Sequence, residues 1–432
     1  MDVFLASAIF IISYYFIMTE KINRAIAALS GGILLLLTGI YTTQEVLFGY
    51  IDWHTIALLF SMMVLISITE KTGLFAYIAI RFAQQARGDP IMLLLGCGAL
   101  TAVGSAFLDN VTTVLIFVPV ILKITRLLRL PSFPYLLTVI FSSNIGGMAT
   151  LIGDPPNIMI GQAVEHFTFI SFMENIGIVA VIMFLIMNGF ILLLFGKGLR
   201  NYRPDVKQLM EIKADAELDR SPLLYKSVIV LLMTISGFLL HTQLHIEMTT
   251  VALCGAVLLL LLTEREIDTD EILSKVEWVT LFFFIGLFAI VGGLQQAGVI
   301  DELARFIVVS TEGDYVKTAL LVLWVSGLFS GFIDNIPFVA AMIPVIQEFE
   351  TYGMVYLDPI WWALALGACL GGNATLIGAS ANVVVAGLAE AEGQPISFLK
   401  FMKYGIPIVL LSLVVSTVYL YIRYLIPYMG QI

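Results

Sequence analysis

The sequence has few charged residues, few cysteines and few histidines. Only 12% of its 432 residues are charged, compared with about 25% in a soluble domain, so the composition excludes an ordinary soluble fold. Cys97, Cys254 and Cys369 all lie in apolar segments and predict no disulfide framework. The four histidines have no partners at metal-ligand spacing. The sequence has no basic block and no phosphate-binding loop, so we expect neither nucleic-acid binding nor nucleotide hydrolysis.

Long apolar runs recur from one end of the sequence to the other. Hydrophobic residues make up 59% of the chain, and the mean hydropathy is +0.98. Because a helix needs about 20 apolar residues to cross a bilayer, the pattern predicts an all-α polytopic membrane protein. The first run begins at Val3 without a basic segment before it, which favours a retained span. We expect crossings near residues 3–19, 24–40, 54–69, 134–165, 175–196, 223–243, 248–263, 278–294, 360–390 and 404–426.

The sequence carries the same motifs twice, 225 positions apart. The first motif contains Asp109-Asn110 and returns with Asp334-Asn335. A second, glycine-rich motif, residues 146–157, returns as residues 371–382 at the same offset. A shared offset without a gap indicates a duplicated unit. We therefore divide the chain into a first repeat, a hydrophilic connector and a second repeat, at residues 1–196, 197–222 and 223–432.

Each repeat contains one apolar segment that is unlike the simple crossings. Residues 91–122 and 317–346 each consist of two short arms that meet at Asp-Asn. A polar, helix-breaking pair in the centre favours a re-entrant hairpin over a single tilted crossing. Residues 134–165 and 360–390 carry the glycine-rich motif and predict interrupted helices. Each repeat then has five spans, and because five is odd, the second repeat is expected to be inverted relative to the first.

The distribution of positive charge supports this topology. With the N-terminus and the C-terminus both outside, every Lys and Arg except Arg305, Lys317 and Arg423 falls in a predicted cytoplasmic loop. Arg24 is among those placed in a cytoplasmic loop. Such a bias is the usual signature of orientation in membrane proteins. We therefore expect a multi-pass protein of the cell inner (plasma) membrane.

Asp109 and Asp334 are the central candidate site residues. Asp is a common N-cap residue, so both could simply cap the half-helix that follows. An ionised carboxylate near the bilayer centre costs about 2.5 kcal/mol or more, however, and Ser or Asn would cap at lower cost. We therefore expect both aspartates to bind ions and to exchange protons, with neighbouring polar groups as ligands: Asn110, Thr112 and Asn335.

The two interrupted helices supply a second set of candidate ligands. Asp154 directly precedes Pro155-Pro156, and we expect it mainly to cap a new half-helix, because its counterpart is Ala379. Carbonyl groups freed at the breaks could bind a cation, and half-helix N-termini could face an anion. The remaining candidates at the breaks are polar or glycine residues: Asn144, Thr150, Gly153, Asn157, Asn373, Thr375, Gly378, Ser380 and Asn382.

These motifs resemble the ArsB/NhaD permease class of the ion transporter superfamily, which includes the melanosomal P protein. More distantly, the layout is similar to that of the dicarboxylate–sodium symporters, which have Ser-Asn-Thr motifs where this chain has Asp109-Asn110 and Asp334-Asn335. The second break lacks the double proline of the first. The resemblance implies a homodimer in which a mobile unit containing the hairpins moves like an elevator against a scaffold. It also allows a cytoplasmic ATPase subunit, for which the connector 197–222 would be the natural surface.

The predicted function is secondary active transport without a cofactor. Our first hypothesis is export of arsenite or antimonite in exchange for H⁺, with the solute held by amide and hydroxyl oxygens. Sodium–proton antiport is the alternative, with Na⁺ and H⁺ sharing the aspartates. Three further hypotheses are a sodium-coupled carboxylate transporter, a channel and an intramembrane enzyme. The acidic hairpin tips argue against the carboxylate transporter, and no nucleophile–base arrangement accompanies the aspartates as an enzyme would require.

Overall fold

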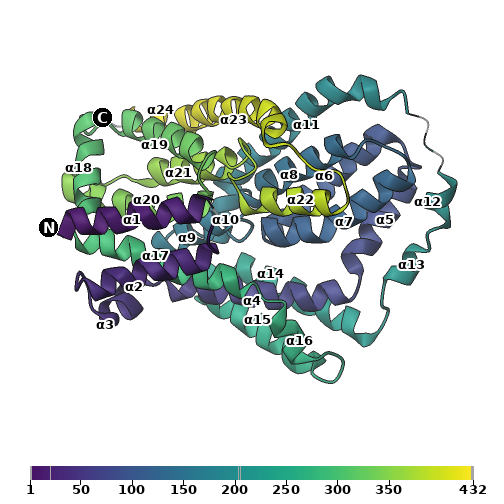
Figure 1. The fold of residues 1–432 in the computed structure, drawn as a ribbon, viewed down its shortest axis with the longest axis horizontal. Coiled ribbons are helices and arrows are strands. Elements are labelled where there is room, and N and C mark those ends of the chain that lie inside the picture. Colours follow the sequence, from purple (N-terminus) through teal and green to yellow (C-terminus); the bar gives the residue numbers. More distant parts are fainter. Residues whose placement is uncertain (1, 20, 203, 205, 430–432) are drawn as a thin grey trace.

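The computed structural model describes residues 2–19, 21–202, 204 and 206–429, and the regular secondary structure of these residues consists of helices (Figure 1). Eight of the described helices are long and apolar enough to cross a membrane. They are α1 (Asp2–Thr19), α4 (Trp53–Lys71), α6 (Pro90–Phe107), α7 (Asn110–Leu127), the continuous α10–η2–α11 (Phe169–Leu199), α14 (Pro222–Leu244), α17 (Trp278–Gln296) and α23–η4 (Phe398–Leu425).

The remaining helices are shorter. Those most closely tied to the site are α2 (Arg24–Leu37), α8 (Ser132–Gly147), α9 (Pro155–Ala163), α15 (Met248–Thr263), α19 (Tyr315–Ser330), α20 (Asn335–Glu348), α21 (Asp358–Gly371) and α22 (Ser380–Ala391). The others lie mostly in connections: α3 (Thr43–Glu45), η1 (Val46–Tyr50), α5 (Leu74–Gln85), α12 (Lys207–Glu211), α13 (Ala214–Glu217), α16 (Thr269–Ser274), α18 (Val299–Ser310), η3 (Phe349–Tyr352) and α24 (Ile426–Met429).

Helix ends coincide with the polar motifs. The arms α6 and α7 are separated only by Leu108 and Asp109, and the arms α19 and α20 by residues 331–334. The chain leaves helical geometry between α8 and α9, and again between α21 and α22, at the glycine-rich motifs. Pro155 stands at the first position of α9, where its missing N–H costs nothing.

The helices pack in two groups, and each group mixes both halves of the sequence. In the paired-helix group (α1, α2, α4, α14, α15, α17), α2 packs on α17 and α15 packs on α4. In the hairpin group (α6–α9, α11, α19–α23), α6 packs on α8, α19 on α21, α7 on α22 and α20 on α9. At the offset of 225, α2 corresponds to α15, α4 to α17, α7 to α20 and α9 to α22. The contact of α2 with α17 therefore has its counterpart in that of α15 with α4, and the contact of α7 with α22 has its counterpart in that of α20 with α9. The contacts between the halves are therefore duplicated.

Glycine allows close backbone approach within each group. A Cβ on Gly286 of α17 would overlap the backbone of Ala28 and Leu29 in α2. A Cβ on Gly146 of α8 would overlap the carbonyl group of Ala102 in α6, and Gly371 of α21 lies equally close to the backbone of α19. Small residues that let helix backbones touch are the common means of packing helices in lipid. Each group is therefore tightly packed internally.

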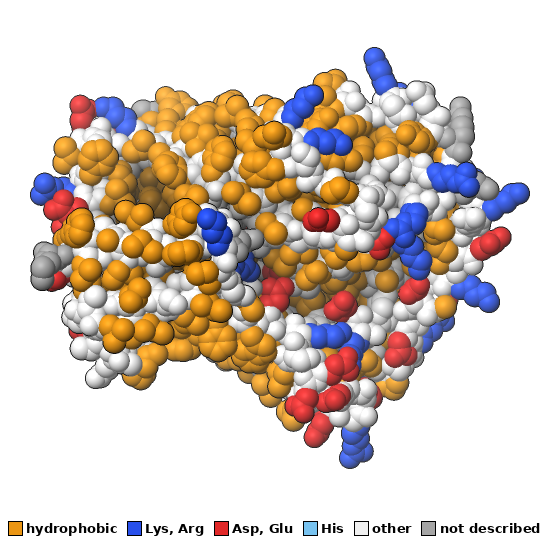
Figure 2. Space-filling model, in the orientation of Figure 1, with side chains coloured by type: hydrophobic (Ala, Val, Ile, Leu, Met, Phe, Trp, Pro, Cys, Tyr) orange, Lys and Arg blue, Asp and Glu red, His pale blue; other side chains and the backbone are white. Residues whose placement is uncertain are grey.

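The surface matches a protein that crosses a bilayer. In Figure 2 hydrophobic side chains cover much of the face in view, and most of the charged side chains gather toward the ends, above all at the end that carries α12, α13 and α16. Both labelled chain ends lie at the opposite end of the molecule (Figure 1). Helix α1 starts at that end, whereas α14 starts at the end of the connector, so the two halves begin from opposite ends.

The connector is more structured than its composition suggests. It contains the short helices α12 and α13 and packs against α5. Gln84 Nε2 donates hydrogen bonds to the carbonyl oxygens of Leu209 (3.1 Å) and Ile212 (2.8 Å), and Arg81 pairs with Asp215 at 2.6 Å. These contacts fix part of the connector on the hairpin side of the molecule.

Candidate functional site

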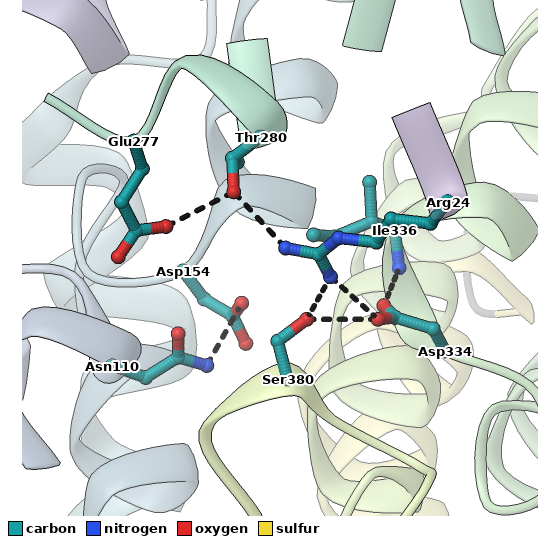
Figure 3. Close-up of polar contacts among 8 residues, drawn as sticks. All are labelled: Arg24, Asn110, Asp154, Glu277, Thr280, Asp334, Ile336 and Ser380. Carbon is teal, nitrogen blue, oxygen red and sulfur yellow. Dashed lines mark hydrogen bonds and ion pairs between the residues drawn. The ribbon is translucent and has the colours of Figure 1, made fainter. Parts of the chain in front are cut away.

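The carboxylate of Asp154 lies where the two hairpin tips meet. Asp154 immediately precedes α9 and is 1% exposed. Its Oδ1 accepts a hydrogen bond from Nδ2 of Asn110 at the start of α7 (3.3 Å), and its Oδ2 accepts one from Nδ2 of Asn335 at the start of α20 (3.3 Å). Figure 3 shows Asp154 and Asn110 facing each other. One buried carboxylate therefore joins the equivalent amides of both halves.

The expected capping role of Asp154 is wrong. Within the described part of the chain, its side chain accepts no hydrogen bond from the first turn of α9. The first two positions of that turn are Pro155 and Pro156, which have no N–H group to cap. The backbone of Asp154 (φ −142°, ψ 131°) is nearly that of Ala379 (φ −151°, ψ 143°), which precedes α22 with an apolar side chain. The carboxylate is therefore not needed to start the helix.

Asp109 and Asp334, in contrast, do cap helices. Asp109 accepts hydrogen bonds from both the backbone N–H (2.9 Å) and the hydroxyl group of Thr112 at the start of α7. Asp334 accepts one from the N–H of Ile336 at the start of α20 (3.0 Å). Both aspartates are only partly buried, and each lines a cavity, so capping does not remove them from the site.

A buried network of amides continues from Asp154. Asn144 Nδ2 donates to the side-chain oxygens of Asn373 (3.0 Å) and Asn382 (2.9 Å), and its own oxygen lies 3.4 Å from Nδ2 of Asn110. At the other break, the Sγ of Cys369 donates to Oδ1 of Asn157 at 3.4 Å. Position 369 is the counterpart of 144 at the offset of 225, and 382 is the counterpart of 157. Each interrupted helix thus contacts the other through the same pair of positions.

Asn157 and Asn382 also stabilise the two breaks. Asn157 Nδ2 donates to the carbonyl groups of Met148 (3.1 Å) and Thr150 (2.9 Å), and Asn382 Nδ2 donates to those of Gly372 (2.7 Å) and Thr375 (2.9 Å). Two carbonyl groups expected to be free cation ligands, those of Thr150 and Thr375, therefore have partners in this structure.

Hydroxyl groups and glycines tie the breaks to the hairpins. Thr150 donates to the carbonyl group of Ala106, and Thr375 donates to that of Gly331 at 2.7 Å. Gly153 and Gly378 lie against the backbone of the adjacent hairpin arms, at Ser105 and at Ser330 and Gly331 respectively, where a side chain would not fit without a shift. These four residues therefore hold the loops of the breaks beside the hairpin tips.

Arg24, Glu277 and Thr280 complete the site, although none of them was predicted as a site residue (Figure 3). Arg24 donates from Nη1 to Ser380 Oγ (2.7 Å) and from Nη2 to Thr280 Oγ1 (3.0 Å). Ser380 donates to Asp334 (2.9 Å), and Thr280 donates to Glu277 (3.0 Å). The guanidinium group is thus linked to Asp334 through the hydroxyl group of Ser380, and to Glu277 through the hydroxyl group of Thr280.

Two cavities give access to these groups. A small one, about 20 Å³ in volume, is lined by Asp109, Asp154 and Glu277 together with Arg24 and other residues. A larger one, about 590 Å³, contains Asp334, Ser380, Arg24 and Glu277 at a polar wall and extends between apolar side chains toward Ser274 of α16. Because α16 lies toward the end of the molecule that carries the connector (Figure 1), the larger cavity extends from the site toward that end.

The atoms around the cavities that could serve as metal ligands are mainly oxygen atoms. Among the described residues, no cluster of three or more His, Cys, Asp or Glu side chains has metal-site geometry. Carboxylate, amide, hydroxyl and carbonyl oxygens are the ligands that hard cations prefer. Cys369 is buried in the amide network, and Cys97 and Cys254 belong to other helices, α6 and α15.

A sequence signal for Glu277 existed. It precedes Trp278, and at the offset of 225 it corresponds to Asp52, which precedes Trp53. Asp52 caps α4 by accepting hydrogen bonds from the backbone N–H groups of His54 and Thr55, whereas within the described chain Glu277 accepts no such backbone bond from α17. Arg24 had no comparable signal, because it stands at the start of the expected crossing 24–40 among the loop charges near Lys21. The structure shows that Arg24 is the first residue of α2 and faces the site.

Comparison with known proteins gives one family and many relatives. Residues 14–367 match the family described as CitMHS, citrate transporter. The chain is 38% identical over 428 residues to a 46 kDa membrane protein of Mycobacterium leprae, covering 98% of this chain and 99% of the relative. It is 39% identical to an uncharacterized transporter of Mycobacterium tuberculosis, covering 97% and 98%. The P protein of Mus musculus is 32% identical over 511 residues, covering 98% of this chain and 60% of that longer protein.

Solved structures of transporters share the fold. The YdaH transporter of Alcanivorax borkumensis superposes with a TM-score of 0.60 over 93% of this chain and 99% of that chain, at 12% identity. MtrF of Neisseria gonorrhoeae, described as one of a class of antimetabolite efflux pumps, gives a TM-score of 0.57 over 91% and 84%, at 11% identity. At these identities the likeness concerns the fold alone.

Proposed function

We propose that this chain, which belongs to the citrate transporter family of the ion transporter superfamily, exchanges protons for a small inorganic solute at the Asp154 site. Its general class is established, because the family and the relatives are transporters: the chain is a secondary transporter and not an enzyme. The proposal concerns the coupling ion, the solute and the residues that bind them.

The observation that carries the proposal is the position of the Asp154 carboxylate. It is buried, it is not used for capping, and it is held between Asn110 and Asn335, one from each hairpin tip. Burying an ionised carboxylate without a cation costs several kcal/mol, about 3–5 when a partner is lost. Binding H⁺ or a metal cation removes that cost. A carboxyl group in this position is therefore suited to alternate between a proton and a cation.

The balance of charge favours a cation over an organic anion. Four acidic side chains line the two cavities, Asp109, Asp154, Glu277 and Asp334, and the basic side chain among the described lining residues is Arg24. Since Arg24 already lies between Glu277 and Asp334, it has little positive charge to offer a carboxylate substrate. Citrate, the substrate in the family description, fits this arrangement less well than Na⁺, for which the carboxylate and amide oxygens are suitable ligands.

Arsenite is the second candidate solute. Neutral arsenite carries three hydroxyl groups, which the amides and hydroxyl groups near Asp154 could hydrogen-bond. The described site contains one thiol, that of Cys369, and not a three-thiol cage that would hold arsenic too tightly for turnover. Export of arsenite or antimonite in exchange for H⁺ would use the same carboxylates as Na⁺ exchange.

Alternating access supplies the movement. We propose that the hairpin group moves, elevator-fashion, against the paired-helix group, that the two halves are inverted repeats in the membrane, and that two copies form a homodimer. The support is the duplicated packing, the opposite starting ends of α1 and α14, and the position of the site between the groups. The connector end would be cytoplasmic, and the cavity at Ser274 would then open inward. The exposed charges of the connector would be the surface for any cytoplasmic ATPase subunit.

Everted membrane vesicles with a pH-sensitive dye test the solute. We expect Na⁺ or Li⁺ to release protons from acidified vesicles that contain the chain. Proton-driven uptake of arsenite without a response to Na⁺ would select the second candidate. Competition by citrate would select a carboxylate, and no response to any of these solutes would contradict the proposed exchange.

A further inference from the structure

Arg24 bridges the two helix groups. It stands at the start of α2 in the paired-helix group, with Thr280 and Glu277 beside it at the start of α17. Its Nη1 lies 2.7 Å from Ser380 Oγ and 3.7 Å from Asp334 Oδ2, and both of these residues belong to the hairpin group. Figure 3 shows the guanidinium group pointing from its own helix into the space between Thr280 and Ser380. The hydrogen bond to Ser380 therefore crosses from one group to the other.

The residues on each side of this bond are fixed within their own group. The close approach of Gly286 to the backbone of Ala28 and Leu29 locks α2 to α17, so Arg24, Thr280 and Glu277 are expected to move together. Ser330 of the second hairpin donates a hydrogen bond to the carbonyl group of Ala368 (2.6 Å), which ties that hairpin to α21. Movement of one group against the other would therefore have to break the contact of Arg24 with Ser380 and Asp334.

We infer that Arg24 is a tethered cation that competes with the transported cation for Asp334 and Ser380. This inference rests on the proposed cation exchange. With no cation bound, the guanidinium group neutralises Asp334 and links the two helix groups. A cation that binds at Asp334 displaces Arg24 and releases the link, so that the loaded hairpin group is free to move.

Arg24 keeps partners within its own helix group when it is displaced from Ser380 and Asp334. Thr280 accepts one hydrogen bond from Arg24 and donates another to Glu277, and the guanidinium group already lies 5.2 Å from the ring centre of Phe283. Thr280 and Phe283 are on α17 and Glu277 directly precedes it, within the same helix group as Arg24. The displaced side chain would keep partners without following the hairpin group. Competition of this kind lets the empty carrier stay in place and so limits leakage of ions without exchange.

The apparent affinity for the cation tests this competition. If Arg24 occupies the site in nine of ten empty molecules, the apparent dissociation constant is raised about tenfold. In proteoliposomes at fixed pH, Arg24→Gln should therefore lower the KM for Na⁺ about tenfold, with a smaller change in the maximum rate. Arg24→Lys retains the charge and should keep a KM near that of the wild type.

Lys21→Gln is the matched control, because Lys21 is an exposed cation three residues away that contacts Tyr15. A KM that is unchanged in folded Arg24→Gln, or that falls equally in Lys21→Gln, overturns the inference.

A second measurement does not depend on the identity of the solute. Spin labels at Leu37 of α2 and Leu399 of α23, which are 79% and 75% exposed, report the position of one group relative to the other. In a Cys254→Ser background, Arg24→Gln should add a second distance that Arg24→Lys does not. A single unchanged distance in Arg24→Gln contradicts the link. If the wild type shows no Na⁺ exchange but the second distance is present, the proposed solute is wrong while the link between the groups stands.

Discussion

At the scale of single residues, Asp109 and Asp334 each have two possible roles that substitution can separate. Both cap a helix, and both line a cavity of the proposed site. Capping requires a short polar side chain, whereas cation binding requires the negative charge. The structure therefore predicts different consequences for Ser and for Ala at these positions.

We expect Asp109→Ser to retain the melting temperature in detergent and to lose proton-coupled exchange, because Ser still caps α7 but has no charge. Asp109→Ala should lose exchange and also about 1 kcal/mol of stability, the usual cost of a lost cap. Thermal unfolding and vesicle transport would be measured on the same preparations. Full exchange activity in Asp109→Ser would show that this aspartate only caps.

Several site residues could be predicted from the sequence, and others could not. Asp109, Asp334 and their Asn neighbours could be found because a polar pair interrupts an apolar segment twice at a fixed offset. The role of Asp154 was misjudged because an Asp before a proline looks like a cap, whereas Pro155 and Pro156 leave little to cap. Arg24 meets Ser380 across 356 positions, and a single sequence contains no signal for such a contact.

At the scale of helices, close packing through glycine decides stability. The ends of the helices could be predicted because Asp, Gly and Pro mark them, but the partners of each helix could not, since they come from the other half of the chain.

Gly146 provides a test of the close packing, because a Cβ there would overlap the carbonyl group of Ala102 and separate α8 from α6.

Gly146→Ala should lower stability by about 1–3 kcal/mol, the range for overpacking, and lower the melting temperature accordingly. Gly189→Ala is the control, because in α11 a Cβ at that position has no heavy atom of the described residues within 4 Å apart from its immediate helical surroundings. That change should stay within about 1 kcal/mol of the wild type. Equal melting temperatures for the two variants would mean that α6 and α8 do not pack this closely.

At the scale of the whole molecule, the orientation in the membrane follows from which end carries the connector. Tyr202 in the connector and Val355 after η3 are both exposed and lie in loops, so cysteines introduced there report the two ends. In a Cys254→Ser background, we expect a membrane-impermeant thiol reagent to label Val355→Cys in intact cells and Tyr202→Cys only in everted vesicles. The reverse pattern would place the termini in the cytoplasm and the cavity at Ser274 on the outside.

The central claim is that the Asp154 carboxylate alternates between a proton and the transported cation. The most direct measurement is proton movement driven by a Na⁺ gradient in proteoliposomes that contain the purified protein. We predict that Asp154→Asn, which preserves the size of the side chain, folds normally and moves no protons, while the exposed Asp270→Asn of α16 behaves like the wild type. Coupled proton movement in Asp154→Asn at the wild-type rate would contradict the account.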